Sequence, residues 1–236
     1  MSLYLTIELC SVAIPLILSF DKKVAFYRHW KTLFPSIIIA GLIFITADII
    51  FTKNGVWGFN PRYHSDILLA GIPLEEWLFF IIIPYASIFT HYVIVTYFPG
   101  TFLSDKSTRI VTWILIACLS LLIIFFHKKI YTTFYSAFMI ILLIISLIGR
   151  SRLINRFYIT FLVILIPFFL VNGILTGSFI QDEVVWYNES AITGFRIFTV
   201  PFEDIMYGFS LIYMILLLME KSGKISLKKS SIPNEE

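Results

Sequence analysis

The sequence predicts an all-α integral membrane protein with seven transmembrane helices, arranged as two parallel three-helix repeats joined by a connector helix. Of the 236 residues, 58% are hydrophobic and only 14% are charged, which is too apolar for a soluble chain of this length. A short motif also occurs twice. Residues 73–80 read PLEEWLFF, and residues 201–208, 128 positions later, read PFEDIMYG. Each copy places adjacent carboxylates at the head of an apolar segment, which indicates an internal repeat.

Seven apolar stretches are long enough to be membrane spans. A transmembrane helix needs about 20 apolar residues, and the backbone in lipid must satisfy its own hydrogen bonds, which favours helices. The alternating pattern typical of a membrane β-barrel is absent from the sequence. The predicted spans are residues 3–20, 33–51, 72–98, 110–126, 131–149, 157–175 and 198–219.

The repeated motif divides the chain into parts. We predict a first repeat at residues 1–104 with helices 1–3, a connector helix within 105–130, and a second repeat at 131–220 with helices 5–7. Residues 221–236 are predicted to be a polar, mobile cytoplasmic tail. An odd connector keeps the two copies parallel, so the pseudo-twofold axis runs along the membrane normal. A site between the copies, lined by both motifs, follows from this arrangement.

Basic residues predict the orientation of the chain. Of the 18 Lys and Arg residues, 13 follow helices 1, 3, 5 and 7, and five lie on the other side. The positive-inside rule therefore places the N-terminus outside and the C-terminus in the cytoplasm. Both motifs then lie toward the outer face.

The motif carboxylates Glu75, Glu76, Glu203 and Asp204 are the candidate catalytic residues. Proline suits the first turn of a helix and acids there are favoured by the helix dipole, so one copy alone could be structural. The repetition and the apolar run that follows favour function. Adjacent acids point about 100° apart on a helix, so one of each pair faces a given cavity. An apolar pocket favours the protonated form of a carboxyl, which can donate a proton.

Polar and aromatic residues near these acids are candidates for substrate binding. Asp48 and Asn172 occupy similar places near the ends of helices 2 and 6, where they either position the acids or are ordinary helix-end residues. Arg196 either pairs with a motif acid or extends to the membrane interface. Aromatic faces can stabilise a cation, although such rings are also common in membrane cores. The candidates are Asp48, Trp77, Phe80, Asn172, Arg196 and Tyr207.

Other patterns exclude several classes of function. The loops near Trp57, Trp186 and Tyr187 are predicted to carry interface anchors. Cys10 and Cys118 lie in apolar segments without metal-ligand spacing, and the histidines show none either. No glycine-rich nucleotide fingerprint is present. We therefore expect no cofactor, no metal and no nucleic-acid partner; the net charge of +3 reflects orientation.

The motifs resemble those of the membrane lycopene cyclases of the heterodimeric type. In that family two small homologous subunits, or one fused chain, each carry a Pro-x-Glu-Glu/Asp motif. Residues 73–80 and the segment GFRIFTVPFED at 194–204 are similar to these motifs, and the chain looks like the fused two-domain form. The resemblance covers nearly the whole chain. Tyr207 and Gly208 stand where the first motif has Phe79 and Phe80, which leaves open whether both halves catalyse.

The resemblance implies a lycopene β-cyclase, an enzyme of the intramolecular lyase or isomerase class. It would convert lycopene to γ-carotene and then β-carotene without net redox change. The family's essential acids map onto Glu75, Glu76, Glu203 and Asp204, and no flavin is expected. The implied partners are lycopene or a related carotenoid from the bilayer and the lipid membrane itself, with oligomerisation possible. The implied location is the bacterial inner membrane.

Two other classes remain as alternatives from the residues alone. A small proton-coupled transporter or channel also uses intramembrane carboxylates within a repeat. Its carboxylates would be expected in broken helices at mid-membrane, whereas these lie at helix heads. A retinal-type photoreceptor is disfavoured because residues 198–219 contain no lysine for a Schiff base.

Overall fold

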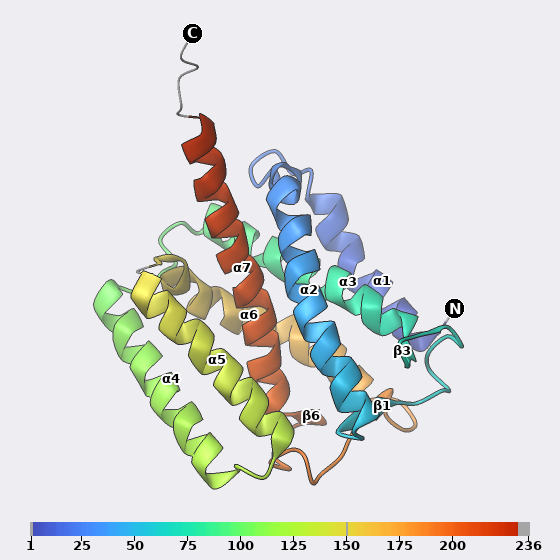
Figure 1. The fold of residues 1–236 in the computed structure, drawn as a ribbon. Helices are drawn as coiled ribbons and strands as arrows, with labels where there is room; N and C mark the ends of the chain where they lie inside the picture. The colour runs from blue at the N-terminus through green and yellow to red at the C-terminus, as the bar shows by residue number, and fades with distance from the viewer. Residues whose placement is uncertain (1, 150, 231–236) are drawn as a thin grey trace.

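The computed structural model describes residues 2–149 and 151–230, and this part of the chain contains seven α-helices (Figure 1). The all-α prediction is confirmed. A short 3₁₀ helix, Phe26–His29, precedes the second α-helix. The α-helices are α1 (Leu3–Leu18), α2 (Trp30–Lys53), α3 (Leu74–Tyr97), α4 (Asp105–Phe125), α5 (Ile130–Gly149), α6 (Leu153–Leu175) and α7 (Glu203–Ser230).

Six of these helices, α2 to α7, are long and apolar enough to cross a membrane. Helix α1 has 16 residues, which span about 24 Å and fall short of a typical hydrocarbon core of about 30 Å. The fold is therefore that of an integral membrane protein, and a seventh span through α1 stays a prediction. Two predicted boundaries were wrong: α3 begins at Leu74 and α7 at Glu203, because short strands occupy the residues before them.

The outer surface of the bundle is apolar, as expected for contact with lipid. Ile17 is 71% exposed and Phe125 is 74% exposed. In α4 the buried residues are Thr108, Thr112 and Leu119, so this helix turns its threonines inward and its large apolar side chains outward. The hydroxyl groups of Thr112 and Tyr158 lie 2.7 Å apart, which ties α4 to α6.

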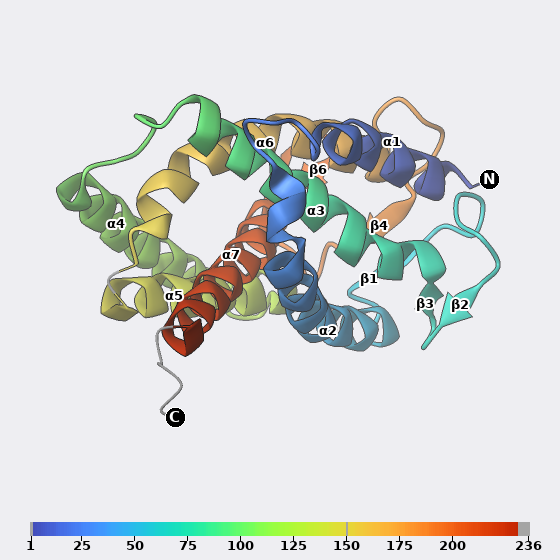
Figure 2. The ribbon, with the colours of Figure 1, turned by 90° about the horizontal axis from the view of Figure 1, so that it is seen from above.

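Helix packing brings the two halves of the chain together. Helix α1 packs along α3, and α5 packs along α7. Helix α2 packs against α7, while α6 packs against α3, so the middle helix of each half contacts the motif helix of the other half. Helix α4 lies at one edge of the bundle, beside α5 and far from α1 (Figure 2). The motif helices α3 and α7 are consequently enclosed by helices from both halves.

Each motif helix is preceded by a small β-hairpin. Strands β2 (Leu68–Leu69) and β3 (Ile72–Pro73) form one hairpin, and β5 (Arg196–Ile197) and β6 (Val200–Pro201) form the other. The hairpins are offset by the same 128 positions as the motifs. The N–H of Leu74 donates to Ile67 O at 2.9 Å, and the N–H of Phe202 donates to Phe195 O at 3.0 Å, again 128 positions apart. These main-chain hydrogen bonds fix the position of the backbone just before each pair of acids.

A third strand pair joins the loops of the two halves. Strand β1 (Trp57–Phe59) pairs antiparallel with β4 (Val185–Tyr187), with Gly58 opposite Trp186. A Cβ atom built on Gly58 would lie 2.3 Å from Cζ2 of Trp186. Only glycine therefore allows the indole ring to lie over the strand. This pair closes the end of the bundle at which α3 and α7 begin (Figure 1).

The C-terminal prediction requires correction. Helix α7 continues to Ser230, so residues 221–230 of the predicted mobile tail are helical and extend beyond the other helices (Figure 1). The remaining predicted tail residues, 231–236, lie outside the described part of the chain.

Candidate functional site

The first acid of each motif is held by the same kinds of donor in the two halves: a hydroxyl group and a loop N–H. Oε1 of Glu75 accepts hydrogen bonds from the Ser2 hydroxyl and the Ser65 N–H, both at 2.6 Å. Oε1 of Glu203 accepts from the Thr132 hydroxyl at 2.6 Å and the Thr193 N–H at 2.7 Å. In each case the N–H belongs to the residue ten positions earlier. Glu75 and Glu203 thus tie the head of a motif helix to its preceding loop and to a neighbouring helix.

The second acid of each motif accepts a hydrogen bond from a tyrosine hydroxyl in the first helix of its own half. The Tyr4 hydroxyl donates to Oε2 of Glu76 at 2.6 Å. The Tyr131 hydroxyl donates to Oδ1 of Asp204 at 2.8 Å. Both carboxyl groups are buried. The two acids of a motif therefore have different neighbours, as the 100° between adjacent helical residues requires.

Tyr187 gives Asp204 a second donor. Its hydroxyl donates to Oδ2 of Asp204 at 3.0 Å. Burial, reinforced by the nearby Asp204 charge, raises the pKa of Tyr187 well above its ordinary value, so the hydroxyl keeps its proton. The prediction that Trp57 and Tyr187 anchor loops at the membrane interface was wrong. Their rings lie 5.8 Å apart beside the motif acids, because the β1–β4 pairing turns both inward.

Asp48 connects the two halves. It is fully buried on α2, and its Oδ2 atom accepts a hydrogen bond of 3.3 Å from the Tyr207 hydroxyl of α7. Its carboxyl group also interacts directly with that of Glu76. Asp48 consequently links a motif acid of the first half to the motif helix of the second half.

The predicted equivalence of Asp48 and Asn172 is wrong. At the end of α2 the N–H of the C-cap residue Asn54 donates to Ile50 O. At the end of α6 the N–H of the C-cap residue Thr176 donates to Asn172 O in the same way. Matching these helix ends aligns Asn172 with Ile50, and Asp48 with Leu170, which is 65% exposed. The second half therefore has no carboxylate at the position of Asp48.

A cavity of about 350 Å³ lies between the motif helices, and it is lined mostly by apolar side chains. Glu76 and Asp204 both line this cavity, whereas Glu75 and Glu203 do not. Its walls come from α1, α3, α6, α7 and the β1–β4 pair, with Tyr131 of α5. The polar and aromatic lining residues are Tyr4, Ser11, Trp57, Phe59, Glu76, Phe79, Ser87, Thr90, Tyr131, Phe168, Asn172, Thr176, Tyr187, Asp204 and Tyr207.

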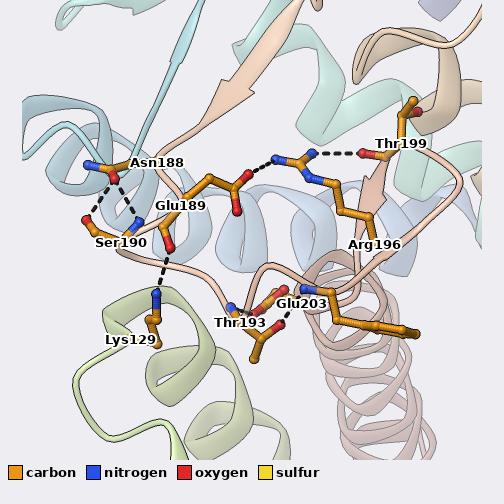
Figure 3. A network of polar contacts seen from close by, with 9 residues as sticks. Lys129, Asn188, Glu189, Ser190, Thr193, Arg196, Thr199 and Glu203 are labelled. Atoms are coloured by element: carbon orange, nitrogen blue, oxygen red, sulfur yellow. Dashed lines mark hydrogen bonds and ion pairs between the residues drawn. The ribbon is translucent and has the colours of Figure 1, made fainter.

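Arg196 pairs with a loop carboxylate instead of a motif acid. Its guanidinium donates to Oε1 of Glu189 at 2.7 Å and to Thr199 O at 2.9 Å (Figure 3). Lys129 Nζ, at the head of α5, donates to Glu189 O at 2.7 Å. This network holds the loop whose Thr193 N–H binds Glu203. Arg196 lies outside the cavity lining, so its contacts position the loop.

The remaining candidates also lie outside the cavity lining. The indole N–H of Trp77 donates to Leu69 O at 3.2 Å and so fastens the first hairpin to α3. Phe80 is buried, and its ring lies 6.5 Å from the Phe44 ring and 6.5 Å from the Tyr207 ring. Among the predicted substrate-binding residues, Asn172 and Tyr207 line the cavity.

Four functional side chains were not among the predicted site residues: the tyrosines Tyr4, Tyr131 and Tyr187, which bind the motif acids, and one buried carboxylate. Glu8 of α1 is 1% exposed, and within the described chain neither of its oxygens has a hydrogen-bond partner. A carboxylate in an apolar helix is itself a sign of function. Tyr4 and Tyr131 could also have been predicted as partners of the acids. Each lies at the start of a helix, α1 or α5, that begins at the same membrane face as the motif of its half.

The arrangement is suited to acid–base chemistry on an apolar molecule. Two carboxyl groups, Glu76 and Asp204, face one largely apolar space, and tyrosine hydroxyls fix the orientation of both. A carboxyl group in such surroundings can donate or accept a proton in the near absence of water. The surrounding aromatic faces can stabilise a cation formed between them.

Comparison with known proteins places the chain in a family. No curated protein and no solved structure matches it. The family model described as lycopene cyclase matches in two segments, residues 1–94 and residues 128–222. These segments cover most of the chain and contain both motifs. The chain therefore belongs to the lycopene cyclase family, whose members act in carotenoid biosynthesis.

Proposed function

We propose that the protein is a lycopene β-cyclase that converts the linear end groups of lycopene to β-rings, giving γ-carotene and then β-carotene. The observation that carries this proposal is that Glu76 and Asp204, one acid from each motif, line the same apolar cavity. Membership of the lycopene cyclase family supports it and favours it over a proton-coupled transporter.

The reaction needs one acid and one base. A carboxyl group transfers its proton to the terminal double bond, which leaves a tertiary carbocation. The electrons of a neighbouring double bond then form the ring-closing carbon–carbon bond and move the positive charge into the ring. A carboxylate removes a ring proton, and the electrons of that C–H bond become the ring double bond. Atoms and electrons balance without an oxidant or reductant, so the reaction is an isomerisation.

The size and lining of the cavity suit one end group at a time. Its 350 Å³ lies at the low end of the roughly 300–1,000 Å³ typical of ligand pockets, which is small for a complete carotenoid. Both motif carboxyls would then act on the same end group. The apolar lining keeps water from the carbocation. Two rings would require two visits, with γ-carotene released and turned between them.

The cavity wall reaches the lipid-facing surface between α1 and α6. Ile14 of α1 is 66% exposed and Leu170 of α6 is 65% exposed, and both line the cavity. A carotenoid dissolved in the bilayer could enter here without crossing water. The substrate would insert one end between these helices while the rest of its chain stays in lipid.

The organisation of the chain and its orientation are part of the same proposal. The 128-position spacing of the hairpins and their hydrogen bonds supports two fused cyclase repeats, 1–104 and 131–220, joined through 105–130. The charge distribution supports an inner-membrane protein of a bacterium with its N-terminus outside. Both motifs would lie toward the outer face.

Deuterium incorporation tests the reaction. The purified protein in liposomes containing lycopene is expected to form β-carotene or γ-carotene without added flavin or nucleotide. In D₂O, each ring should gain one deuterium, because the acid that protonates the alkene exchanges with solvent. Mass spectrometry of the separated pigments measures this. Unchanged lycopene, or rings without deuterium when acid exchange is complete, would contradict the proposed acid–base cyclisation.

Blocking the lipid-facing rim should stop the reaction. Cys10 lines the cavity and is exposed on α1, so Cys10→Trp is expected to lower cyclisation by about 100-fold by misplacing the end group. Cys118→Trp is the matched control, since Cys118 is exposed on α4 and lies outside the cavity lining. Equal activity in the two variants, at equal protein level, would rule out entry between α1 and α6.

A further inference from the structure

The two cavity-lining carboxyls have different hydrogen-bond surroundings. Both oxygens of Asp204 accept hydrogen bonds from tyrosine hydroxyls, those of Tyr131 and Tyr187. An ionised carboxylate is an acceptor only, and two donors aimed at its two oxygens stabilise the charged form. Asp204 is therefore arranged as a carboxylate that is ready to take a proton.

Glu76 has carboxyl groups for neighbours instead. One of its oxygens accepts from Tyr4, and its carboxyl interacts directly with that of Asp48. Oδ1 of Asp48 is buried, and the polar groups beside the Asp48 carboxyl are the Glu76 carboxyl and the hydroxyls of Tyr135 and Tyr207. Two adjacent buried carboxylates cannot both be ionised, because like charges repel strongly where water is absent. The Glu76–Asp48 pair must therefore retain a proton.

Glu8 adds a third carboxyl to this side of the cavity. It lies one helical turn after Tyr4, it is 1% exposed, and the charges of Glu76 and Glu75 act on it. Neither oxygen has a hydrogen-bond partner in the described part of the chain, so nothing in its surroundings stabilises an ionised form. A negative charge on either Glu8 or Glu76 therefore disfavours a negative charge on the other.

The second half lacks these carboxyls. Tyr135 lies one turn after Tyr131, as Glu8 lies one turn after Tyr4, and Leu170 matches the place of Asp48. The repeat is therefore asymmetric in its chemistry. The first half has two additional buried carboxyls near Glu76, whereas the second half gives Asp204 a second tyrosine donor.

We propose that Glu76 is the general acid and Asp204 the general base, and that Glu8 and Asp48 are positioning residues that keep a proton on Glu76. This assignment rests on the proposed cyclase function. Glu76 gives the proton because it lines the cavity, whereas Asp48 and Glu8 do not. Each ring moves one proton from Glu76 to the substrate and one from the ring to Asp204. Asp204 must then release a proton and Glu76 must regain one before the next ring forms.

The pH dependence of kcat/KM for lycopene in liposomes separates the two roles. Activity rises with pH as the base ionises and falls as the acid loses its proton, which gives a bell-shaped profile. The titratable and charged groups around Glu76 are Tyr4, Glu8, Asp48, Glu75, Tyr135, Tyr187 and Tyr207. Those around Asp204 are Asp48, Tyr131, Tyr135, Tyr187, Arg196 and Glu203.

The assignment predicts which limb each variant moves. Asp48→Asn and Glu8→Gln remove a competing carboxyl, so the alkaline limb should move to lower pH, by about one unit for Asp48→Asn. Tyr187→Phe removes a donor to Asp204, so the acidic limb should move to higher pH. Glu183→Gln, which changes an exposed loop carboxylate, is the control and should leave both limbs in place.

Reversed roles would give the opposite pattern. If Glu76 were the base, Asp48→Asn would move the acidic limb to lower pH; if Asp204 were the acid, Tyr187→Phe would move the alkaline limb to higher pH. Either result, or limbs that do not move in active variants, would overturn the assignment while leaving the cyclase function intact. Failure of the wild-type protein to cyclise lycopene would instead overturn the function itself. A merely structural role of Glu8 and Asp48 would lower activity at all pH values without moving a limb.

Discussion

Replacing Glu76 with Gln is expected to lower lycopene cyclisation by about 100-fold to 10,000-fold, the range typical for loss of a general acid or base. Gln keeps the size of the side chain and can still accept the hydrogen bond from the Tyr4 hydroxyl. It has no acidic proton to give to the alkene. Turnover of lycopene in liposomes, at matched amounts of membrane-inserted protein, measures the effect.

Glu75→Gln is the matched control for this variant. Glu75 accepts hydrogen bonds from Ser2 and Ser65 and does not line the cavity. A Gln side chain can keep these contacts, with its amide N–H₂ donating to the Ser65 hydroxyl. We therefore expect a much smaller loss. A severe loss in Glu75→Gln with normal turnover in Glu76→Gln would show that the other acid of the motif is the reacting one.

Asp204→Asn is expected to cause a loss of the same order, because removal of the base prevents loss of the ring proton. Both tyrosine donors would remain near the new amide. The double variant Glu76→Gln/Asp204→Asn should be little worse than either single variant, since residues that act on one reaction as a unit are not additive.

The double variant also decides between one reaction site and two. If each motif served an independent site, each single variant would keep about half of the activity and only the double variant would be inactive. Initial rates of γ-carotene formation measure this directly. Half-activity in both single variants would contradict the shared cavity.

Much of the fold follows from the sequence because the membrane imposes simple rules. Apolar segments of sufficient length must be helices, so the positions of α2 to α6 could be predicted to within about five residues, whereas the C-terminal end of α7 could not. The ends were harder to predict. Residues 72 and 73, and 200 and 201, are apolar or proline and read as helix, yet they form hairpin strands. Their conformation depends on main-chain pairing, which a hydropathy pattern does not record.

The site was only partly predictable for a similar reason. The repetition of two carboxylates identified Glu76 and Asp204, which line the cavity. It could not identify Tyr187, whose hydroxyl reaches Asp204 only because β1 pairs with β4 across the two halves. The match of Asp48 with Asn172 failed because the loops after α2 and α6 differ in length. Such contacts depend on packing between segments far apart in the sequence.

Pigment chromatography of lycopene-accumulating bacteria that express this chain tests the central claim most directly. Wild-type protein is expected to convert lycopene to γ-carotene or β-carotene, and Glu76→Gln, present at the same level in the membrane, should leave lycopene unchanged. Unchanged lycopene with well-expressed wild-type protein would contradict the account, as would full conversion by the Glu76→Gln variant.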